Sequence, residues 1–312
     1  MKIIFMGTPD FAVSALKKLI EKHEVLAVVT QPDKKQGRGN KIIYSPVKTL
    51  ALEHGIEVLQ PIGAKESDFI ESLKKYNADI FIVVAYGQIL KKELLDIPKF
   101  GCINIHGSLL PEYRGASPIQ RAIIDGKDET GVTIMFLDEG VDTGDMILKE
   151  SVKIEQSDNF ETLRDKLAVV GADLLEKALV QIENGTAMPE KQDDSKSSHT
   201  KKIKKEACHI NFNDTSKNII NLIRALNPQP GAYMFYNEKM IKVWEAAEYD
   251  SHDSGSNDKA GTVIEVIPKK GFVIKTSDGA LLITDLQNQS GKRMKADAYL
   301  RGNKIETGII IS

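Results

Sequence analysis

The stretch GCINIHGSLLP, residues 101–111, decides the fold, because it reads as a β-strand that ends in a turn. Apolar and polar side chains alternate from Ile103 to His106, which is typical of a strand whose two faces meet different surroundings. Asn104 and His106 are two residues apart, so their side chains point to the same face. We therefore expect an amide and an imidazole to meet at the carboxyl end of this strand, where open α/β sheets bind ligands.

A second turn, DEGVDTG at residues 138–144, follows another strand-like run at residues 132–137. It adds carboxylates that are flanked by glycines. An amide, a histidine and a carboxylate could together assist attack on a carbonyl group, because that reaction needs a donor for the oxyanion and an acceptor for a proton. On a strand, however, an Asn-x-His pair is more often structural than functional. The residues alone leave four candidates for the carboxylate: Asp138, Glu139, Asp142 and Asp145.

Strand and helix patterns alternate through the first 184 residues. Strand-like runs lie at residues 2–6, 25–30, 57–59 and 80–85, and helix-like runs lie at residues 11–22, 66–76, 88–95 and 159–184. Ser45 and Pro46 mark the start of a further helix, with Ser45 as its N-cap. This order predicts an α/β, Rossmann-like domain with a mostly parallel sheet covered on both faces. The turn at residues 7–10 lacks the G-x-G-x-x-G spacing, which disfavours a dinucleotide cofactor.

The composition changes near residue 190. Residues 190–206 are polar and lysine-rich, which predicts an exposed linker. A helix-like run at residues 215–225 and about five short strand-like runs follow, and turn signals separate these runs. This pattern fits a small OB-like β-barrel. We therefore predict a catalytic domain at residues 1–189, a linker at residues 190–206 and an OB-like domain at residues 207–312.

Several motifs give the chain a resemblance to a known family. They are GSLLP at residues 107–111, YRGASP at residues 113–118, DTG at residues 142–144 and MKIIFMGTPDF at residues 1–11. The chain resembles the 10-formyltetrahydrofolate-dependent formyltransferases in both of its halves. The resemblance implies transfer of a formyl group from 10-formyltetrahydrofolate to the amino group of initiator methionyl-tRNA, which serves translation initiation. It also implies that Asn104, His106 and Asp142 are the catalytic residues.

The resemblance further implies binding roles for two segments. Ser108, Leu109, Leu110 and Pro111 resemble the folate contact, since two leucines can cover a planar ring while polar groups bond its edge. By itself this segment is more often an ordinary turn at the end of a strand. The turn at residues 83–87 is a weaker candidate for the same ligand. Arg114 could serve the ligand or the acceptor, or it could tie its loop to a carboxylate.

The long loop at residues 31–44 holds four cations around two glycines. Loops of this length in compact domains are often functional, and such a loop suits docking onto a phosphate backbone. The resemblance places a contact with the acceptor end of tRNA in this loop, with Arg38 and Lys41 as the candidates. The alternative is a solvated loop without a binding role.

Charge and composition limit the classes of function. Residues 1–200 hold 25 Lys and Arg against 31 Asp and Glu, whereas residues 201–312 hold 17 against 13. This asymmetry hints that the second domain is the main contact for a polyanion. Cys102 and Cys208 have no metal-like spacing, so no metal is expected. We find no secretory signal and no apolar run that could span a membrane, and we expect a cytoplasmic protein without a membrane partner.

Two alternatives to this function stay open. The acceptor could be the amine of a sugar nucleotide or of glycinamide ribonucleotide, because the catalytic stretch does not distinguish among amines. The second alternative is of another class, an OB-type nucleic-acid-binding protein with an inactive enzyme domain. The intact set of Asn104, His106 and Asp142 argues against it.

Overall fold

A computed structural model describes residues 1–36, 41–250 and 258–311. The chain forms two compact units, each made from segments that are not continuous in sequence. Unit 1 consists of Met1–Pro118, Glu129–Lys153 and Arg164–Thr200. Unit 2 consists of Ile119–Asp128, Ile154–Leu163 and Lys201–Ser312. The predicted boundaries at 189 and 207 stay a prediction.

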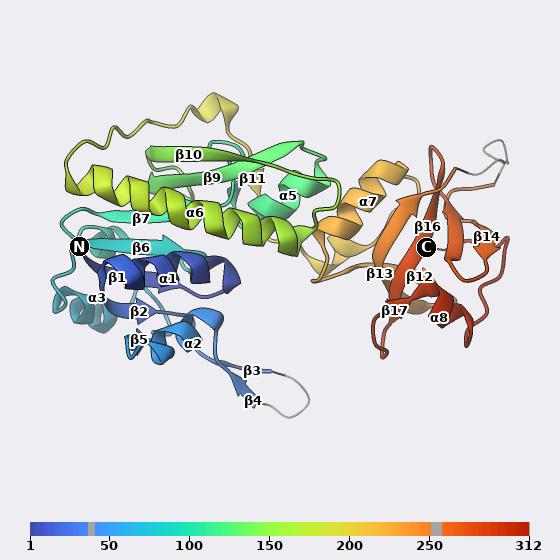
Figure 1. Cartoon of the computed structure of the whole chain (residues 1–312), viewed down its shortest axis with the longest axis horizontal. Helices are drawn as coiled ribbons and strands as arrows, with labels where there is room; N and C mark the ends of the chain where they lie inside the picture. Colours follow the sequence, from blue (N-terminus) through green and yellow to red (C-terminus); the bar gives the residue numbers. More distant parts are fainter. Residues whose placement is uncertain (37–40, 251–257, 312) are drawn as a thin grey trace. The chain divides into compact units, whose positions relative to one another are not determined.

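Unit 1 is built on a seven-stranded sheet in the order β10-β9-β7-β6-β1-β2-β5 (Figure 1). Its strands are β1 (Lys2–Gly7), β2 (Glu24–Val29), β5 (Glu57–Leu59), β6 (Ile80–Val84), β7 (Cys102–His106), β9 (Glu129–Phe136) and β10 (Met146–Lys153). The pairs from β5 to β7 are parallel, whereas β9 pairs antiparallel with β7 and with β10. The sheet is therefore mostly parallel, as predicted.

Helices cover both faces of this sheet. They are α1 (Val13–Lys22), α2 (Pro46–Glu53), α3 (Ser67–Lys74), α4 (Lys92–Leu95) and α6 (Phe160–Glu183). On one face α6 runs beside α1, and ion pairs from Lys18 to Asp173 and from Lys22 to Glu176 join the two helices (Figure 1). Residues of α3 and α4 pack on the other face, in one cluster with Cys102. Both faces are thus shielded from water, which explains the nearly continuous apolar runs of β1 and β6.

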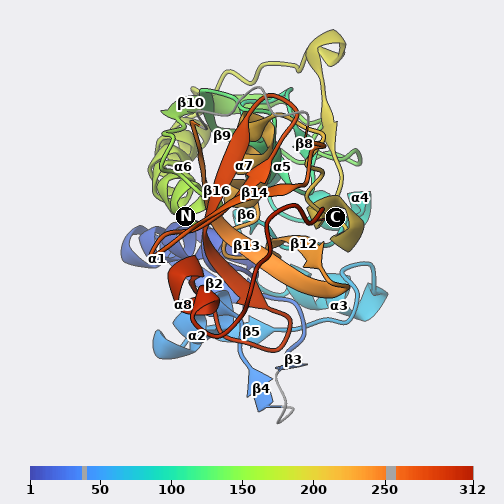
Figure 2. The same cartoon turned by 90° about the vertical axis from the view of Figure 1, so that its right-hand side faces the viewer.

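Short strands extend two loops of unit 1. β3 (Lys34–Gln36) and β4 (Lys41–Ile43) pair antiparallel and stand away from the main sheet (Figure 2). β8 (Arg114–Gly115) pairs parallel with β11 (His199–Thr200). The second pair shows that residues near 200 return to the loop that follows β7. The polar composition of residues 190–206 indicates an exposed linker, yet Gln192 and Thr200 are buried.

Unit 2 contains an antiparallel sheet in the order β12-β13-β16-β15-β14, with β17 paired to β16. Its strands β12, β13, β14 and β16 are labelled in Figure 2. The strands are β12 (Ala232–Tyr236), β13 (Lys239–Glu248), β14 (Val263–Ile267), β15 (Gly271–Lys275), β16 (Ala280–Asn288) and β17 (Met294–Lys295). The unit also holds α7 (Ser216–Ala225), α8 (Ala296–Leu300) and α5 (Pro118–Ile124), except that the first residue of α5, Pro118, belongs to unit 1. One apolar core joins α7 and α8 to the sheet. An α/β domain with a second, smaller β domain is the predicted fold class, and it is confirmed.

None of the helices in the described residues is both long enough and apolar enough to cross a membrane.

Candidate active site

Strand β7 carries the polar residues of the site on one of its faces. Asn104 and His106 share the face of Cys102, while Ile105 faces α6, where a Cβ added at Gly171 would lie 2.9 Å from it. Asn104 and His106 are only 8% and 5% exposed. Because β7 is parallel to β6, both residues lie at the carboxyl edge of the parallel part of the sheet. The strand pattern therefore puts two polar side chains where open sheets bind ligands.

The imidazole of His106 is held from both sides. Its Nε2 lies 3.0 Å from the carbonyl oxygen of Tyr113. A carbonyl oxygen only accepts hydrogen bonds, so Nε2 must carry the proton of this bond. The other ring nitrogen, Nδ1, lies 3.6 Å from Oδ1 of Asp142. This separation is longer than a hydrogen bond, but it puts an imidazole beside a carboxylate, and these are two kinds of group that general acid–base catalysis uses.

Asp142 has an unusual backbone conformation and a fixed carboxylate. Its φ is +55°, in the left-handed region that only a few per cent of residues other than glycine adopt. Its Oδ2 accepts a hydrogen bond from the backbone N–H of Gly115 at 2.7 Å, which leaves Oδ1 for His106. The strained backbone and this bond together aim the carboxylate at the imidazole.

The other three candidate carboxylates have different surroundings. Asp138 accepts hydrogen bonds from Gly140 N–H and from the Thr143 hydroxyl, so it builds the turn itself. Glu139 and Asp145 are exposed to solvent. Of the four acids that the residues alone leave open, Asp142 is the one whose carboxylate lies beside His106, with 3.6 Å between Oδ1 and Nδ1.

The amide of Asn104 is open to a ligand. Only 8% of Asn104 is exposed. Within the part of the chain that the structure describes, no side chain or backbone group forms a hydrogen bond with its amide. The amide atoms of Asn104 are not among the fully buried polar atoms that lack a partner, so water or a ligand can reach them. Its N–H groups can donate to the oxygen of a bound carbonyl compound without first breaking another bond.

The predicted folate segment is partly used by the fold. The Ser108 hydroxyl donates to the Glu112 carbonyl oxygen at 2.6 Å, and Ser108 is fully buried. Leu110 packs in a cluster with Met135 and Met146. The side chains of Leu109 and Pro111 are half-buried. Two of the four predicted residues thus build the loop, and the folate assignment of all four stays a prediction.

The turn after β6 presents backbone atoms. The side chain of Tyr86 is 1% exposed, and burial raises the pKa of its hydroxyl to about 12. The Gln31 amide donates to the Tyr86 carbonyl oxygen at 3.0 Å. One carbonyl of this turn is therefore already engaged, which weakens the turn as a folate contact.

Arg114 ties its loop to distant residues. The side chain is 3% exposed, and its Nε donates to Oε1 of Gln192 at 2.9 Å. A terminal nitrogen donates to Oδ1 of Asp194 at 2.8 Å. These contacts favour the reading in which Arg114 fixes the loop. Sequence reasoning missed Gln192, because nothing near it in the sequence indicates a partner 78 residues away.

The predicted tRNA contacts, Arg38 and Lys41, belong to the loop at residues 31–44, whose described part forms β3 and β4. Arg38 lies outside the described residues, and of Lys41 only its place in β4 is described. The next residues, Ile42 and Ile43, are 60% and 52% exposed. At the base of the hairpin, the Lys48 ammonium bonds Asp33 at 2.6 Å, and this bond lowers the pKa of the Asp33 carboxyl group. The role of Arg38 and Lys41 stays a prediction.

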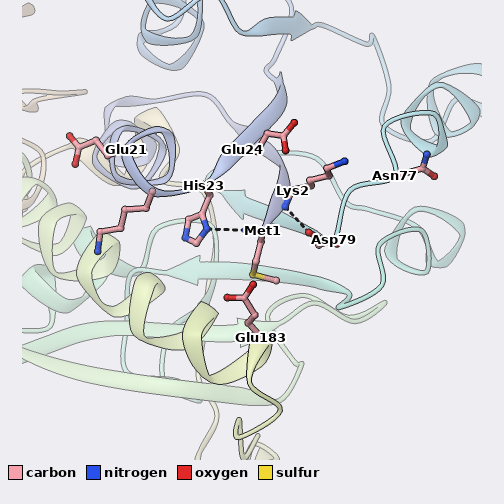
Figure 3. A pocket seen from close by; sticks show the side chains of 9 residues that line it. Met1, Lys2, Glu21, His23, Glu24, Asn77, Asp79 and Glu183 are labelled. Carbon is pink, nitrogen blue, oxygen red and sulfur yellow. Dashed lines mark hydrogen bonds between the residues drawn. The ribbon is translucent and has the colours of Figure 1, made fainter.

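A hollow lies at the opposite end of the sheet (Figure 3). Its lining comes mainly from the amino ends of β1 and β2 and from the end of α1. Several of its polar groups bond one another: the terminal amine lies 3.4 Å from Nδ1 of His23, and Lys2 N–H donates to Asp79 (Figure 3). Parallel sheets bind ligands at the carboxyl ends of their strands, so this hollow is not the candidate active site.

The described residues contain no group of three or more His, Cys, Asp or Glu that could hold a metal ion.

Family models match most of the chain. The model described as "Formyl transferase" matches residues 1–179, and the model described as "Formyl transferase, C-terminal domain" matches residues 202–304. A methionyl-tRNA formyltransferase of Caldanaerobacter subterraneus subsp. tengcongensis is 46% identical over 313 residues, which cover 100% of both chains. The protein of that name from Agathobacter rectalis is 49% identical over 309 residues, which cover 99% of this chain and 98% of the relative.

Two solved structures are similar in fold. HypX from Aquifex aeolicus, in complex with tetrahydrofolic acid, has a TM-score of 0.65 at 18% identity over 99% of this chain and 50% of that one. The sugar 3N-formyl transferase WlaRD has a TM-score of 0.64 at 23% identity over 94% of this chain and 99% of that one. At such low identity the likeness shows the fold alone.

Proposed function

Because the chain belongs to the formyl transferase family, we propose that it transfers the formyl group of 10-formyltetrahydrofolate to the amino group of initiator methionyl-tRNA. The observation that carries the proposal is identity of 46% to 49% over the full chain with proteins named methionyl-tRNA formyltransferase. The product would be N-formylmethionyl-tRNA, and the reaction would take place in the cytoplasm. Tetrahydrofolate in a structural neighbour supports a folate co-substrate.

The proposed reaction assigns one task to Asn104 and one to the pair of Asp142 and His106. The amine nitrogen attacks the formyl carbon, and the carbonyl oxygen becomes an oxyanion. The Asn104 amide donates hydrogen bonds to this oxyanion, which stabilises the transition state more than the ground state. The Asp142–His106 pair accepts the proton that the amine loses. When the bond from carbon to the folate nitrogen breaks, that nitrogen takes up a proton, so one proton is removed and one is returned.

Binding of folate is assigned to the loop at residues 108–111. The half-buried side chains of Leu109 and Pro111 offer apolar surface beside the site, and Ser108 and Leu110 hold the loop in shape. Two of the four residues would thus contact the folate, and the other two would support the loop.

The proposal is tested with the purified protein, 10-formyltetrahydrofolate and charged initiator tRNA. We expect N-formylmethionine after the aminoacyl bond is hydrolysed. In separate reactions, uncharged tRNA, a dTDP-linked amino sugar or glycinamide ribonucleotide replaces the charged tRNA. Formylation of either small amine without formylation of the tRNA would contradict the proposal. The names of the full-length relatives do not favour those acceptors.

Binding of tRNA is assigned to the loop at residues 31–44, with Arg38 and Lys41 as the contacts. Replacing Arg38 with alanine should raise the KM for methionyl-tRNA about 5- to 10-fold, because one cation that contacts a phosphate is lost. The KM for the folate should stay within about twofold. Steady-state kinetics at two salt concentrations measure both constants, and the difference between the variants should shrink at the higher one. Lys74→Ala, an exposed cation on α3, is the matched control. Equal effects of the two substitutions would remove Arg38 from the interface.

A further inference from the structure

The side chain of Gln192 is buried beside the turn that carries Asp142. It is 5% exposed, although its neighbours Lys191 and Asp193 are exposed. Its Nε2 donates to the carbonyl oxygen of Asp142 at 2.9 Å and to that of Gly144 at 2.8 Å. One amide group therefore bonds two carbonyl groups of the turn, one on each side of Thr143.

The orientation of this amide is fixed by its third contact. Arg114 Nε donates to Oε1 of Gln192 at 2.9 Å. If the amide were flipped, its oxygen would face two carbonyl oxygens and its NH₂ group would face a guanidinium, which has no acceptor. Arg114 is held in turn by Asp194, so the chain of contacts runs from an exposed carboxylate to the catalytic turn.

The same segment also holds the loop that bonds Asp142 and His106. Ser198 accepts a hydrogen bond from Tyr113 N–H with its hydroxyl and one from Arg114 N–H with its carbonyl group. The Tyr113 carbonyl oxygen accepts from His106, and Gly115 N–H donates to Asp142. Residues 190–200, which we call the return segment, thus hold the loops that position Asp142 and His106.

We propose that Gln192 is a positioning residue for formyl transfer, whose amide holds the Asp142 carboxylate against His106. This inference rests on the function proposed above. The left-handed backbone of Asp142 is unfavourable by itself, and two hydrogen bonds to the carbonyl groups of the turn stabilise it. Without them the turn would relax and the carboxylate would move away from the imidazole. A displacement of about 1 Å in a catalytic group can cost about 100-fold in rate.

The test combines Gln192→Met with Asp142→Asn. Methionine keeps the length of the side chain but makes none of the three hydrogen bonds. In the otherwise wild-type protein, Gln192→Met should lower kcat about 10- to 100-fold, with both KM values within about threefold. In the Asp142→Asn protein, the same change should lower kcat less than about twofold, because the residue it acts on is already lost. Lys191→Ala, in the same segment, should leave kcat within about twofold.

Two kinetic outcomes would overturn the inference. One is a kcat for Gln192→Met within about twofold of the wild type. The other is an equal fall in both backgrounds, which a general loss of structure would produce. If Gln192→Met does not fold, Gln192→Glu replaces it, because a carboxylate keeps an acceptor for Arg114 but cannot donate to the turn and places an oxygen against its two carbonyl oxygens.

Hydrogen exchange separates this inference from the proposed function. If the wild-type protein formylates no acceptor, the function fails, but exchange at residues 138–145 still reports on the turn. Gln192→Met should speed exchange there relative to Lys191→Ala, and unchanged exchange would overturn the inference without any activity assay.

Discussion

Asp142→Asn is expected to lower kcat for formyl transfer by about 100- to 10,000-fold, because an amide cannot accept the proton that a carboxylate accepts. The fold should tolerate the change. Asparagine is one of the residues that adopt a positive φ most readily, and its side-chain oxygen can still accept from Gly115 N–H. Single-turnover rates with saturating tRNA measure the chemical step, and thermal melting measures the stability.

Asp145→Asn is the matched control for that substitution. Asp145 lies three residues further along the same turn, and it is exposed to solvent. Its replacement should leave kcat within about twofold. Equal losses in the two variants would show that the turn needs negative charge in general, and they would contradict the specific role of Asp142.

The second large effect is expected at Asn104. Asn104→Ala should lower kcat about 100- to 1,000-fold, the usual loss when one donor to an oxyanion is removed. The melting temperature should barely fall, because within the described residues the amide bonds no protein group and its removal leaves no partner unsatisfied. Loss of rate without loss of stability would distinguish a catalytic amide from a structural one.

Asn104→Asp sharpens this prediction. It keeps the shape of the side chain but replaces the donor by a carboxylate that repels an oxyanion, so kcat should fall at least as far as in Asn104→Ala. Activity of either variant within about fivefold of the wild type would remove Asn104 from the mechanism.

Local patterns were sufficient to predict much of the fold. The period-two alternation of β7 puts Asn104 and His106 on one face, and the structure has them there because the other face packs against α6. Ser45 is the N-cap of α2, and its hydroxyl accepts from Lys48 N–H as the sequence predicts. The helix expected at residues 159–184 is α6, Phe160–Glu183. In each case the signal lies within a few residues of the feature.

Features that depend on distant partners could not be predicted in this way. Four acids compete on sequence for one role, and the strand–turn geometry that selects Asp142 as the partner of His106 becomes visible only in three dimensions. The polar composition of residues 190–206 describes their average exposure, whereas the burial of Gln192 results from hydrogen bonds to residues about 50 and 78 positions earlier. Strand β10 was not predicted either, because its outward face is polar and its partner is β9.

The return segment determines where the chain can be divided into fragments. A fragment that stops at residue 189, where the composition changes, would lose Gln192 and Ser198 and with them the support of the catalytic turn. A fragment that continues through Thr200 would retain both. In chimeras that exchange the second half of the chain between relatives, the crossover should therefore lie after Thr200. Each catalytic loop then stays with the return segment of the same protein.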